Sequence, residues 1–504
     1  MNASLGTLWL GALISFALVA GAMPPVLRAW RSLGRRDDEV SLRKVHTGQI
    51  PRAGGLVILF GFGVMLVAGL AGVSSLSATH ELFSVSPLTG ALVGALVVGL
   101  TGAYDDLIGL RPRTKLAMQL VGATLAVLYG LHWPALELLV GWEYNWLATL
   151  LTIGFLVASV NAVNMMDGLD GLAAGICLVG FGTVVAAIFA GPTIVPGTLA
   201  VGWAAACALG ATGGFLLHNR HPARVFMGDA GSYFLGFLLP ALLVQVGPVR
   251  WRVPEIQLSI AILPLAVPMF DMTLAIVRRT LRGQPIFSGD SDHVHHRLMA
   301  AGFTHARAVT VLWLSAAMFA SLAYLNVIGI GGWWTLLGTL VAMLLAAVLL
   351  GYHRMLAQLP AFTGERFLGW RDRRREVMEL LDTLEHVRLS GTDRGEARWR
   401  RVAPDLALVL GRLGIPAFQI RRFDDVVVGS GDARDAWAWL SLPVPGEDGA
   451  ELRLALAVRL PELQQERLML IERAVLAVAG GGGAAARQLT VVRGGGERPS
   501  AAAP

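Results

Sequence analysis

Five polar clusters interrupt an otherwise apolar chain, and each contains side chains that could bind a phosphate group or a metal ion. Carboxylates and amides supply the oxygen ligands that Mg²⁺ prefers, whereas ammonium, guanidinium and imidazole groups bind phosphate oxygens. In chain order, the candidate residues are Lys44 and Arg52; Asp105, Asp106 and Lys115; Asn161, Asn164, Asp167 and Asp170; Phe226 and Asp229; and His293, His295, His296 and Arg297.

The first cluster places cations ahead of two glycines. Lys44 and Arg52 precede Gly54 and Gly55, which open an apolar run. Glycine permits close approach of a backbone to a ligand, so this segment could hold an anionic substrate. An anchor of basic residues on the inner side of a membrane is the alternative.

The second cluster has two adjacent carboxylates, Asp105 and Asp106, which repel each other and therefore require a nearby cation or a shared proton. Arg111 and Lys115 follow within a few residues. Such a pair suits Mg²⁺, which commonly uses one or two carboxylates plus substrate phosphates. A solvated helix cap is the alternative interpretation.

The third cluster lies between two apolar runs. Asn161 and Asn164 are three residues apart, so they share one face of a helix. Two Asp-Gly steps, at Asp167 and Asp170, then predict a tight turn. A turn alone accounts for the glycines, but two acids and two amides exceed what a turn requires.

In the fourth cluster, small residues surround Asp229 at the start of a predicted helix, shortly after Phe226. A helix N-terminus offers backbone N–H groups and favours phosphate. Asp229 could instead serve as a plain N-cap.

The fifth cluster, from Asp292 to Arg297, holds three imidazoles and a guanidinium. It could bind a pyrophosphate or balance a metal site, and its crowded spacing without cysteine disfavours zinc. The preceding apolar run contains Pro264, Pro268 and Asp271, which predict a bent helix with a costly buried acid. That helix could open a lipid-facing groove, or Asp271 could pair with a neighbouring helix.

Membrane helices must position these clusters. Of 504 residues, 55% are hydrophobic and 15% are charged, against about 25% charged in soluble domains. The two cysteines lie in apolar runs, so no disulfide framework is expected. With roughly 20 residues per span, the chain is predicted to be an all-α polytopic membrane protein of about eleven transmembrane helices. Their predicted starts are Leu5, Gly54, Pro87, Lys115, Trp146, Gly171, Pro196, Ser232, Ile256, Ala308 and Gly331.

Loop charges predict the orientation. Most odd-numbered loops are basic, and even-numbered loops are nearly devoid of Lys and Arg, with Arg250 and Arg252 the main exception. The positive-inside rule then places the odd loops in the cytoplasm and the N-terminus outside. All five clusters fall in odd loops or at their helix ends, which predicts one active site on the cytoplasmic face of the membrane.

The chain changes character after the last predicted span. We expect a membrane-embedded domain over 1–353, a basic juxtamembrane linker over 354–375, a small cytoplasmic α+β domain over 376–479 and a disordered tail over 480–504. Leu440 to Leu460 predicts a strand hairpin, and Pro461 to Ala479 an amphipathic helix.

Taken in this order, the motifs from Lys44 to Leu298 resemble the polyprenyl-phosphate N-acetylhexosamine-1-phosphate transferases. The resemblance implies transfer of HexNAc-1-phosphate, commonly GlcNAc-1-phosphate, from a UDP-sugar to undecaprenyl phosphate with release of UMP. The stretch from His293 to Arg297 resembles the branch that initiates O-antigen of lipopolysaccharide, teichoic acid or similar glycans. Val294 between histidines disfavours the phospho-MurNAc-pentapeptide transferases of peptidoglycan synthesis, which remain an alternative.

The resemblance also implies residue roles. Asp229 and Asn164 resemble ligands of Mg²⁺, with Mn²⁺ as an alternative ion, and Asp105 and Asp106 resemble the acidic pair near the prenyl phosphate, Asp105 being its proposed base. The remaining implied assignments are nucleotide-side contacts for Asp167, Asp170 and Phe226, phosphate contacts for Lys44 and Lys115, and a grip on sugar and pyrophosphate by His293, His295, His296 and Arg297.

The expected partners are thus a UDP-N-acetylhexosamine, undecaprenyl phosphate and membrane lipids, with no nucleic acid; a homodimer is an open alternative. Two functions of other classes compete with the transferase. An ion-coupled transporter would place its acids at mid-membrane depth, and a non-catalytic receptor would keep the site for binding alone.

Overall fold

The structure is a computed structural model that describes most of the first 349 residues and five strands further on. The described residues are 2–32, 50–72, 86–141, 145–190, 196–250, 253–281, 293–349, 404, 417–422, 425–431, 438–443, 450–456 and 490–493. The chain forms two compact units, residues 1–359 and residues 360–504.

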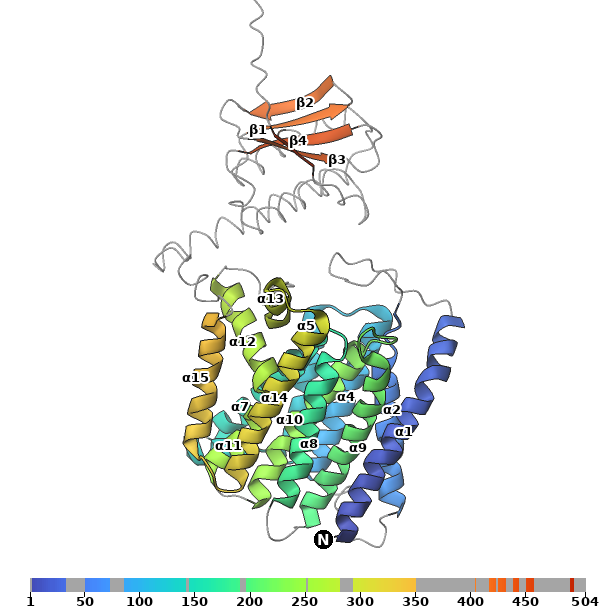
Figure 1. Ribbon diagram of the computed structural model, residues 1–504, viewed down its shortest axis with the longest axis vertical. Coiled ribbons are helices and arrows are strands. Elements are labelled where there is room, and N and C mark those ends of the chain that lie inside the picture. The colour runs from blue at the N-terminus through green and yellow to red at the C-terminus, as the bar shows by residue number, and fades with distance from the viewer. Residues whose placement is uncertain are drawn as a thin grey trace, which may run out of the picture. The chain divides into compact units, whose positions relative to one another are not determined.

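The first unit is a bundle of helices (Figure 1). Its helices are α1 (Asn2–Ser32), α2 (Gly54–Gly72), α4 (Pro87–Ile108), α5 (Pro112–Leu128), α6 (Pro134–Val140), α7 (Asn145–Met166), α8 (Leu172–Phe189), α9 (Pro196–Asn219), α10 (Gly228–Arg250), α11 (Pro254–Ile262), the 3₁₀ turn η2 (Leu263–Leu265), α12 (Ala266–Leu281), α13 (Val294–Ala300), α14 (His305–Val327) and α15 (Trp333–Leu349).

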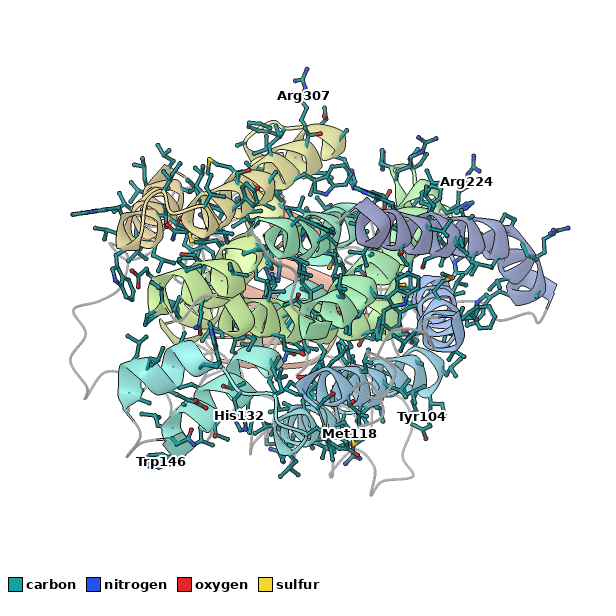
Figure 2. All side chains as sticks on the ribbon, turned by 90° about the horizontal axis from the view of Figure 1, so that it is seen from below. Tyr104, Met118, His132, Trp146, Arg224 and Arg307 are labelled. Atoms are coloured by element: carbon teal, nitrogen blue, oxygen red, sulfur yellow. The ribbon has the colours of Figure 1, made fainter. Side chains whose placement is uncertain are left out.

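Eight candidate spans among the described helices are long and apolar enough to cross a membrane, and two shorter apolar helices accompany them. The prediction of a helical, multi-pass membrane unit is therefore confirmed, while the number of spans and the side of the N-terminus stay predictions. Large side chains on the outside of the bundle are exposed, such as Tyr104 at 51% and Trp146 at 60% (Figure 2). Lipid accommodates such apolar surface without cost.

Helix α10 is the centre of the bundle. Between Gly228 and Val246, 94% of the residues in its most apolar stretch are buried. The helix packs against α2, α4, α7 and α8. Close packing of α10 depends on glycine: a Cβ on Gly102 of α4 would collide with the carbonyl of Asp229, and one on Gly55 of α2 with the backbone of Gly231. These glycines bring two helix ends against the first turn of α10.

The predicted bend between Pro264 and Pro268 is present. Helix α11 passes into the 3₁₀ turn η2, which contains Pro264, before α12 continues. Proline lacks the N–H that a continuous helix needs, so the series of backbone hydrogen bonds along the helix is interrupted at Pro264.

The second unit contains a five-stranded antiparallel sheet. The strands are β1 (Ala417–Arg422), β2 (Asp425–Gly431), β3 (Ala438–Pro443), β4 (Ala450–Leu456) and β5 (Thr490–Arg493), in the order β2-β1-β4-β3-β5. The predicted hairpin is present as β3 paired with β4, where Leu440 lies opposite Leu454. The predicted helix from Pro461 to Ala479 and the tail lie outside the described residues.

The close contact between α4 and α10 yields a stability prediction. Gly102→Ala should destabilise the bundle by about 1–3 kcal/mol, because the added methyl group meets backbone that cannot rotate away. Thermal unfolding of the purified protein in detergent measures this. Gly154→Ala on α7 is the matched control, since a Cβ there meets nothing within 4 Å. Equal unfolding temperatures for the two variants would contradict the packing argument.

Candidate active site

Asp106, on the last turn of α4, caps the first turn of α10 across the bundle. Its Oδ1 accepts a hydrogen bond from the backbone N–H of Asp229 at 3.0 Å, and its Oδ2 accepts one from Ala230 at 2.9 Å. Gly228 lies directly before them with a φ of +70°, a conformation that glycine adopts without strain. A Cβ there would also come within 2.6 Å of the Asp106 carboxylate.

This cap bears on two sequence-based interpretations. Helix α10 begins at Gly228, as predicted for the cluster around Asp229, and slightly before Ser232, near which the membrane span was predicted to begin. The expectation that this terminus binds a phosphate through its amides is wrong for the N–H groups of Asp229 and Ala230, which donate to Asp106. Asp229 is consequently not the cap, and its carboxylate is available for other contacts.

Lys115, on the first turn of α5, joins two of the carboxylates. Its Nζ lies 2.5 Å from Asp105 Oδ2 and 3.0 Å from Asp229 Oδ2. Asp105 Oδ1 also accepts a hydrogen bond from the backbone N–H of Leu110 at 2.6 Å. The cation expected beside the Asp105–Asp106 pair is therefore present, and it links α4, α5 and α10.

The two amides of α7 face neighbouring helices. Ser232 Oγ lies 2.9 Å from Asn164 Oδ1 and 3.0 Å from the carbonyl oxygen of Gly228, so these two acceptors share its single proton. Asn161 Nδ2 donates to Gln119 Oε1 of α5 at 2.7 Å. Asn164 thus lies against the first turn of α10, whereas Asn161 holds α7 to α5.

Asp167 follows the end of α7 and faces an excess of negative charge. Burial raises the pKa of this carboxyl well above its usual range, and the charges of Asp229 and Asp106 raise it further, while Arg52 opposes them. The charges of Asp106 and Asp229 therefore disfavour ionisation of Asp167. A bound cation would favour the ionised form of such a group.

Backbone pairing joins the first and fourth clusters. Phe226 donates its N–H to the carbonyl of Pro51 at 2.9 Å, and Gly54 donates back to the carbonyl of Phe226 at 3.0 Å. Gly55 donates to the carbonyl of Met227 at 2.8 Å. The segment that carries Arg52 is thereby placed beside the entry to α10, whereas Lys44 lies outside the described residues.

The histidine cluster is held by the buried acid of the bent helix. Asp271 is fully buried; its Oδ2 lies 3.0 Å from His293 Nδ1, and its Oδ1 accepts the N–H of Val294 at 2.8 Å. Asp271 therefore caps the start of α13. Of the two interpretations of this bent helix, the pairing of Asp271 with a neighbouring element is the one observed.

The histidines of α13 reach the third cluster. His295 Nε2 would lie 3.1 Å from a Cβ on Gly168, so it contacts the turn that carries Asp167. The His295 and His296 rings are 4.3 Å apart. Burial lowers the pKa of His295 to about 3, and the neighbouring His296 contributes to the shift, so His295 is neutral at pH 7. Arg297, which lies on the same helix two residues after His295, is partly exposed.

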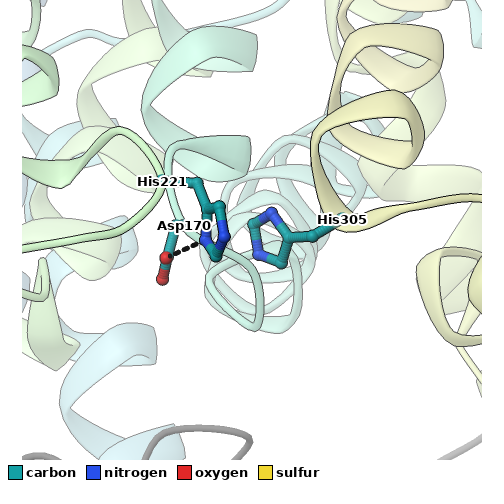
Figure 3. A group of neighbouring side chains, drawn as sticks. All are labelled: Asp170, His221 and His305. Carbon is teal, nitrogen blue, oxygen red and sulfur yellow. Dashed lines mark hydrogen bonds and ion pairs between the residues drawn. The ribbon is translucent and has the colours of Figure 1, made fainter.

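Asp170 lies in a different group, which sequence reasoning missed. Its Oδ2 is 2.8 Å from His221 Nδ1 and accepts the N–H of Ala223 at 3.1 Å. The His221 ring stacks on that of His305 with centroids 4.2 Å apart (Figure 3). The two histidines stand 84 positions apart in the sequence, and only the fold brings them together.

The described candidate residues therefore form two neighbouring groups. An oxygen-rich group of Asp105, Asp106, Asn164 and Asp229 surrounds the first turn of α10, and Lys115 bridges Asp105 to Asp229. An imidazole-bearing group comprises α13 and the Asp170 cluster. Hard oxygen donors with fixed cations can bind a divalent ion and phosphates, and imidazoles can bind a second anionic portion of a ligand.

Comparisons with known proteins agree with these motifs. Residues 88–247 match the model of glycosyl transferase family 4. A probable undecaprenyl-phosphate N-acetylglucosaminyl 1-phosphate transferase of Bacillus subtilis is 36% identical over 285 residues, which cover 56% of this chain and 75% of the relative.

Two further relatives carry related names. A decaprenyl-phosphate N-acetylglucosaminephosphotransferase of Mycobacterium tuberculosis H37Rv is 36% identical over 54% of this chain and 71% of the relative's length. An undecaprenyl-phosphate alpha-N-acetylglucosaminyl 1-phosphate transferase of Escherichia coli K12 is 31% identical over 57% of this chain and 76% of the relative's length.

The lowered pKa of His295 predicts a pH dependence of stability. Its folded pKa of about 3 lies below the ordinary 6.5, so this residue's contribution is complete above pH 6.5 and is lost as the pH falls from there towards 3. The loss is about 1.4 kcal/mol per pH unit in that window. Thermal unfolding from pH 7.5 down to pH 5 measures it, as a difference between the wild type and His295→Gln. Parallel pH profiles for the two proteins would contradict the assignment.

Proposed function

Because the chain belongs to glycosyl transferase family 4, in the branch of the polyprenyl-phosphate N-acetylglucosamine-1-phosphate transferases, we propose that it transfers N-acetylhexosamine 1-phosphate to undecaprenyl phosphate. The donor is a UDP-sugar, UDP-GlcNAc first among the candidates, and the by-product is UMP. The product would initiate a cell-surface glycan. The observation that supports this chemistry most directly is the bridge from Lys115 to Asp105 and Asp229 beside the capped terminus of α10.

The residues around that terminus fit Mg²⁺, and Mn²⁺ is an alternative with the same ligand preferences. Asp229 and Asn164 would hold the ion, since both offer oxygen atoms at the first turn of α10 and the mutual repulsion of Asp106, Asp167 and Asp229 favours a cation. When bound, the ion neutralises charge on the donor's diphosphate.

The reaction requires little proton transfer. A phosphate monoester has a second pKa of about 6, so the acceptor phosphate is already largely ionised near pH 7. Its oxygen attacks the phosphorus that carries the sugar, and the bond to the bridging oxygen of UMP breaks. Asp105, held by Lys115 and the N–H of Leu110, organises that lysine; Lys115 and Arg52 then position phosphate oxygens.

The other motifs bind the donor in this proposal. Asp271 fixes the start of α13, which presents His295, His296 and Arg297 to the sugar and pyrophosphate. Phe226, aligned by its pairing with Pro51, would lie with Asp167 on the nucleotide side, whereas Asp170 in the same turn pairs with His221. Catalysis then depends on positioning and on charge complementarity.

We further propose that the site faces the cytoplasm of a bacterial inner membrane. The helix ends that flank the basic loops of the positive-inside pattern lie on the side of the bundle that carries α13, opposite the start of α1 (Figure 1). Both substrates are then available, the sugar nucleotide from the cytoplasm and the prenyl phosphate from the inner leaflet.

A turnover assay tests the proposed function. Purified protein with Mg²⁺, undecaprenyl phosphate and a UDP-sugar should release UMP, fastest with UDP-GlcNAc or a close N-acetylhexosamine. The assay is run against a panel of UDP-sugars that includes UDP-MurNAc-pentapeptide, beside an active relative as positive control. Release from the pentapeptide donor alone would assign the peptidoglycan reaction instead, and no release from any donor would overturn the proposal.

Removal of the proposed metal ligand yields the second functional prediction. Asp229→Asn should lower the rate of UMP release by about 10²-fold or more, since it removes charge from a position where electrostatic stabilisation is concentrated. Glu137→Gln, on α6 at the other end of the bundle, is the matched control and should keep the wild-type rate. Wild-type turnover by Asp229→Asn at all Mg²⁺ concentrations would rule out Asp229 as a ligand.

A further inference from the structure

We propose that Asp170, His221 and His305 form a binding site for a divalent ion of the zinc class, separate from the oxygen-rich site at Asp229. One potential ligand atom from each side chain lies within 4.8 Å of the other two (Figure 3). This proposal goes beyond the transferase activity, which does not require such an ion.

Three segments far apart in the sequence contribute one side chain each. Asp170 lies in the turn between α7 and α8, His221 in the connection between α9 and α10, and His305 opens α14. Asp170 is 4% exposed, and its Oδ2 is oriented by the N–H of Ala223. Three side chains from three separate segments converge here at one end of the bundle.

The geometry allows coordination after a small adjustment. Zinc–nitrogen and zinc–oxygen bonds of about 2.0–2.2 Å place tetrahedral ligand atoms roughly 3.3 Å apart. The 2.8 Å between Asp170 Oδ2 and His221 Nδ1 is shorter than that, and the other separations in the set are at most 4.8 Å. The side chain of His221 is 44% exposed, so it can rotate to equalise these distances.

The chemical types of the three ligand side chains determine which ion fits the site. Two imidazoles suit zinc, cobalt or nickel, whereas Mg²⁺ prefers the carboxylate and amide oxygens found at Asp229 and Asn164. Three protein ligands leave a fourth position for water or for an anionic group. The two sites are therefore chemically distinct even though Asp170 and Asp167 share one turn.

A bound ion would restrain the connection that enters α10. This connection runs from Arg220 to Met227, and its end pairs with Pro51, Gly54 and Gly55. Linking its start to the first residue of α14 would fix both ends of the segment. The expected consequence is a protein that unfolds at higher temperature when zinc is present.

Equilibrium dialysis of the full-length protein tests the proposal. Protein stripped with a chelator is dialysed against Zn²⁺ in an excess of Mg²⁺, and the bound zinc is then measured. The wild type and Asp229→Asn should each retain one Zn²⁺ per chain. His221→Ala and His305→Ala should bind it at least about tenfold more weakly, because the loss of an outer contact alone costs that much. His132→Ala, an exposed histidine between α5 and α6, is the matched control and should bind as the wild type does.

A second readout reports on coordination itself. Co²⁺ in place of Zn²⁺ should give visible absorption bands of an imidazole-bound ion in the wild type, and these bands should be absent from His221→Ala. Since His221 is more exposed than His305, its removal should disturb the metal-free fold less, so this variant decides the question if His305→Ala fails to fold. Zinc retention equal in the wild type and the double variant His221→Ala/His305→Ala would overturn the site. Loss of zinc only in Asp229→Asn would do so as well.

Discussion

The hydrogen bonds from the first turn of α10 to Asp106 are the interaction on which the rest of the site depends. A helix N-terminus buried within a membrane bundle has N–H groups without intrahelical acceptors, and leaving them without partners is costly. A carboxylate from α4 resolves this, because a negative charge at a helix N-terminus is favourable. The glycines at positions 55 and 102 then allow α2 and α4 to approach α10 closely, and Asp229 is placed where its carboxylate meets Lys115.

Concentrated negative charge is the second constraint. Asp105, Asp106, Asp167 and Asp229 gather where Lys115 and Arg52 supply only part of the balance. A divalent cation and the cationic side chains together would balance the negative charges of a diphosphate donor and a phosphate acceptor. The proposed chemistry therefore follows from charge placement more than from any single acid or base, and the neutral state of His295 is consistent with a binding role.

Sequence patterns predicted the helices and the motif clusters because apolar run length and cluster order are local properties. They also predicted the bend at Pro264, and of a cation or a shared proton beside Asp105 the structure has the cation. The contacts that build the site span long stretches of chain and could not be predicted from spacing. Asp106 reaches α10 across 123 positions, and Asp271 reaches His293 across 22. His221 and His305 carried no local signal, since they stand far apart in the sequence and only the fold brings them together.

The most direct test of this account is the Mg²⁺ dependence of UMP release by Asp106→Ala. If Asp106 acts by holding the first turn of α10, the variant keeps the ligand Asp229 but positions it poorly. It should then require more Mg²⁺ for half-maximal rate than the wild type and recover part of its activity at high Mg²⁺, whereas Asp229→Asn should not recover. A wild-type Mg²⁺ dependence for Asp106→Ala would contradict the account.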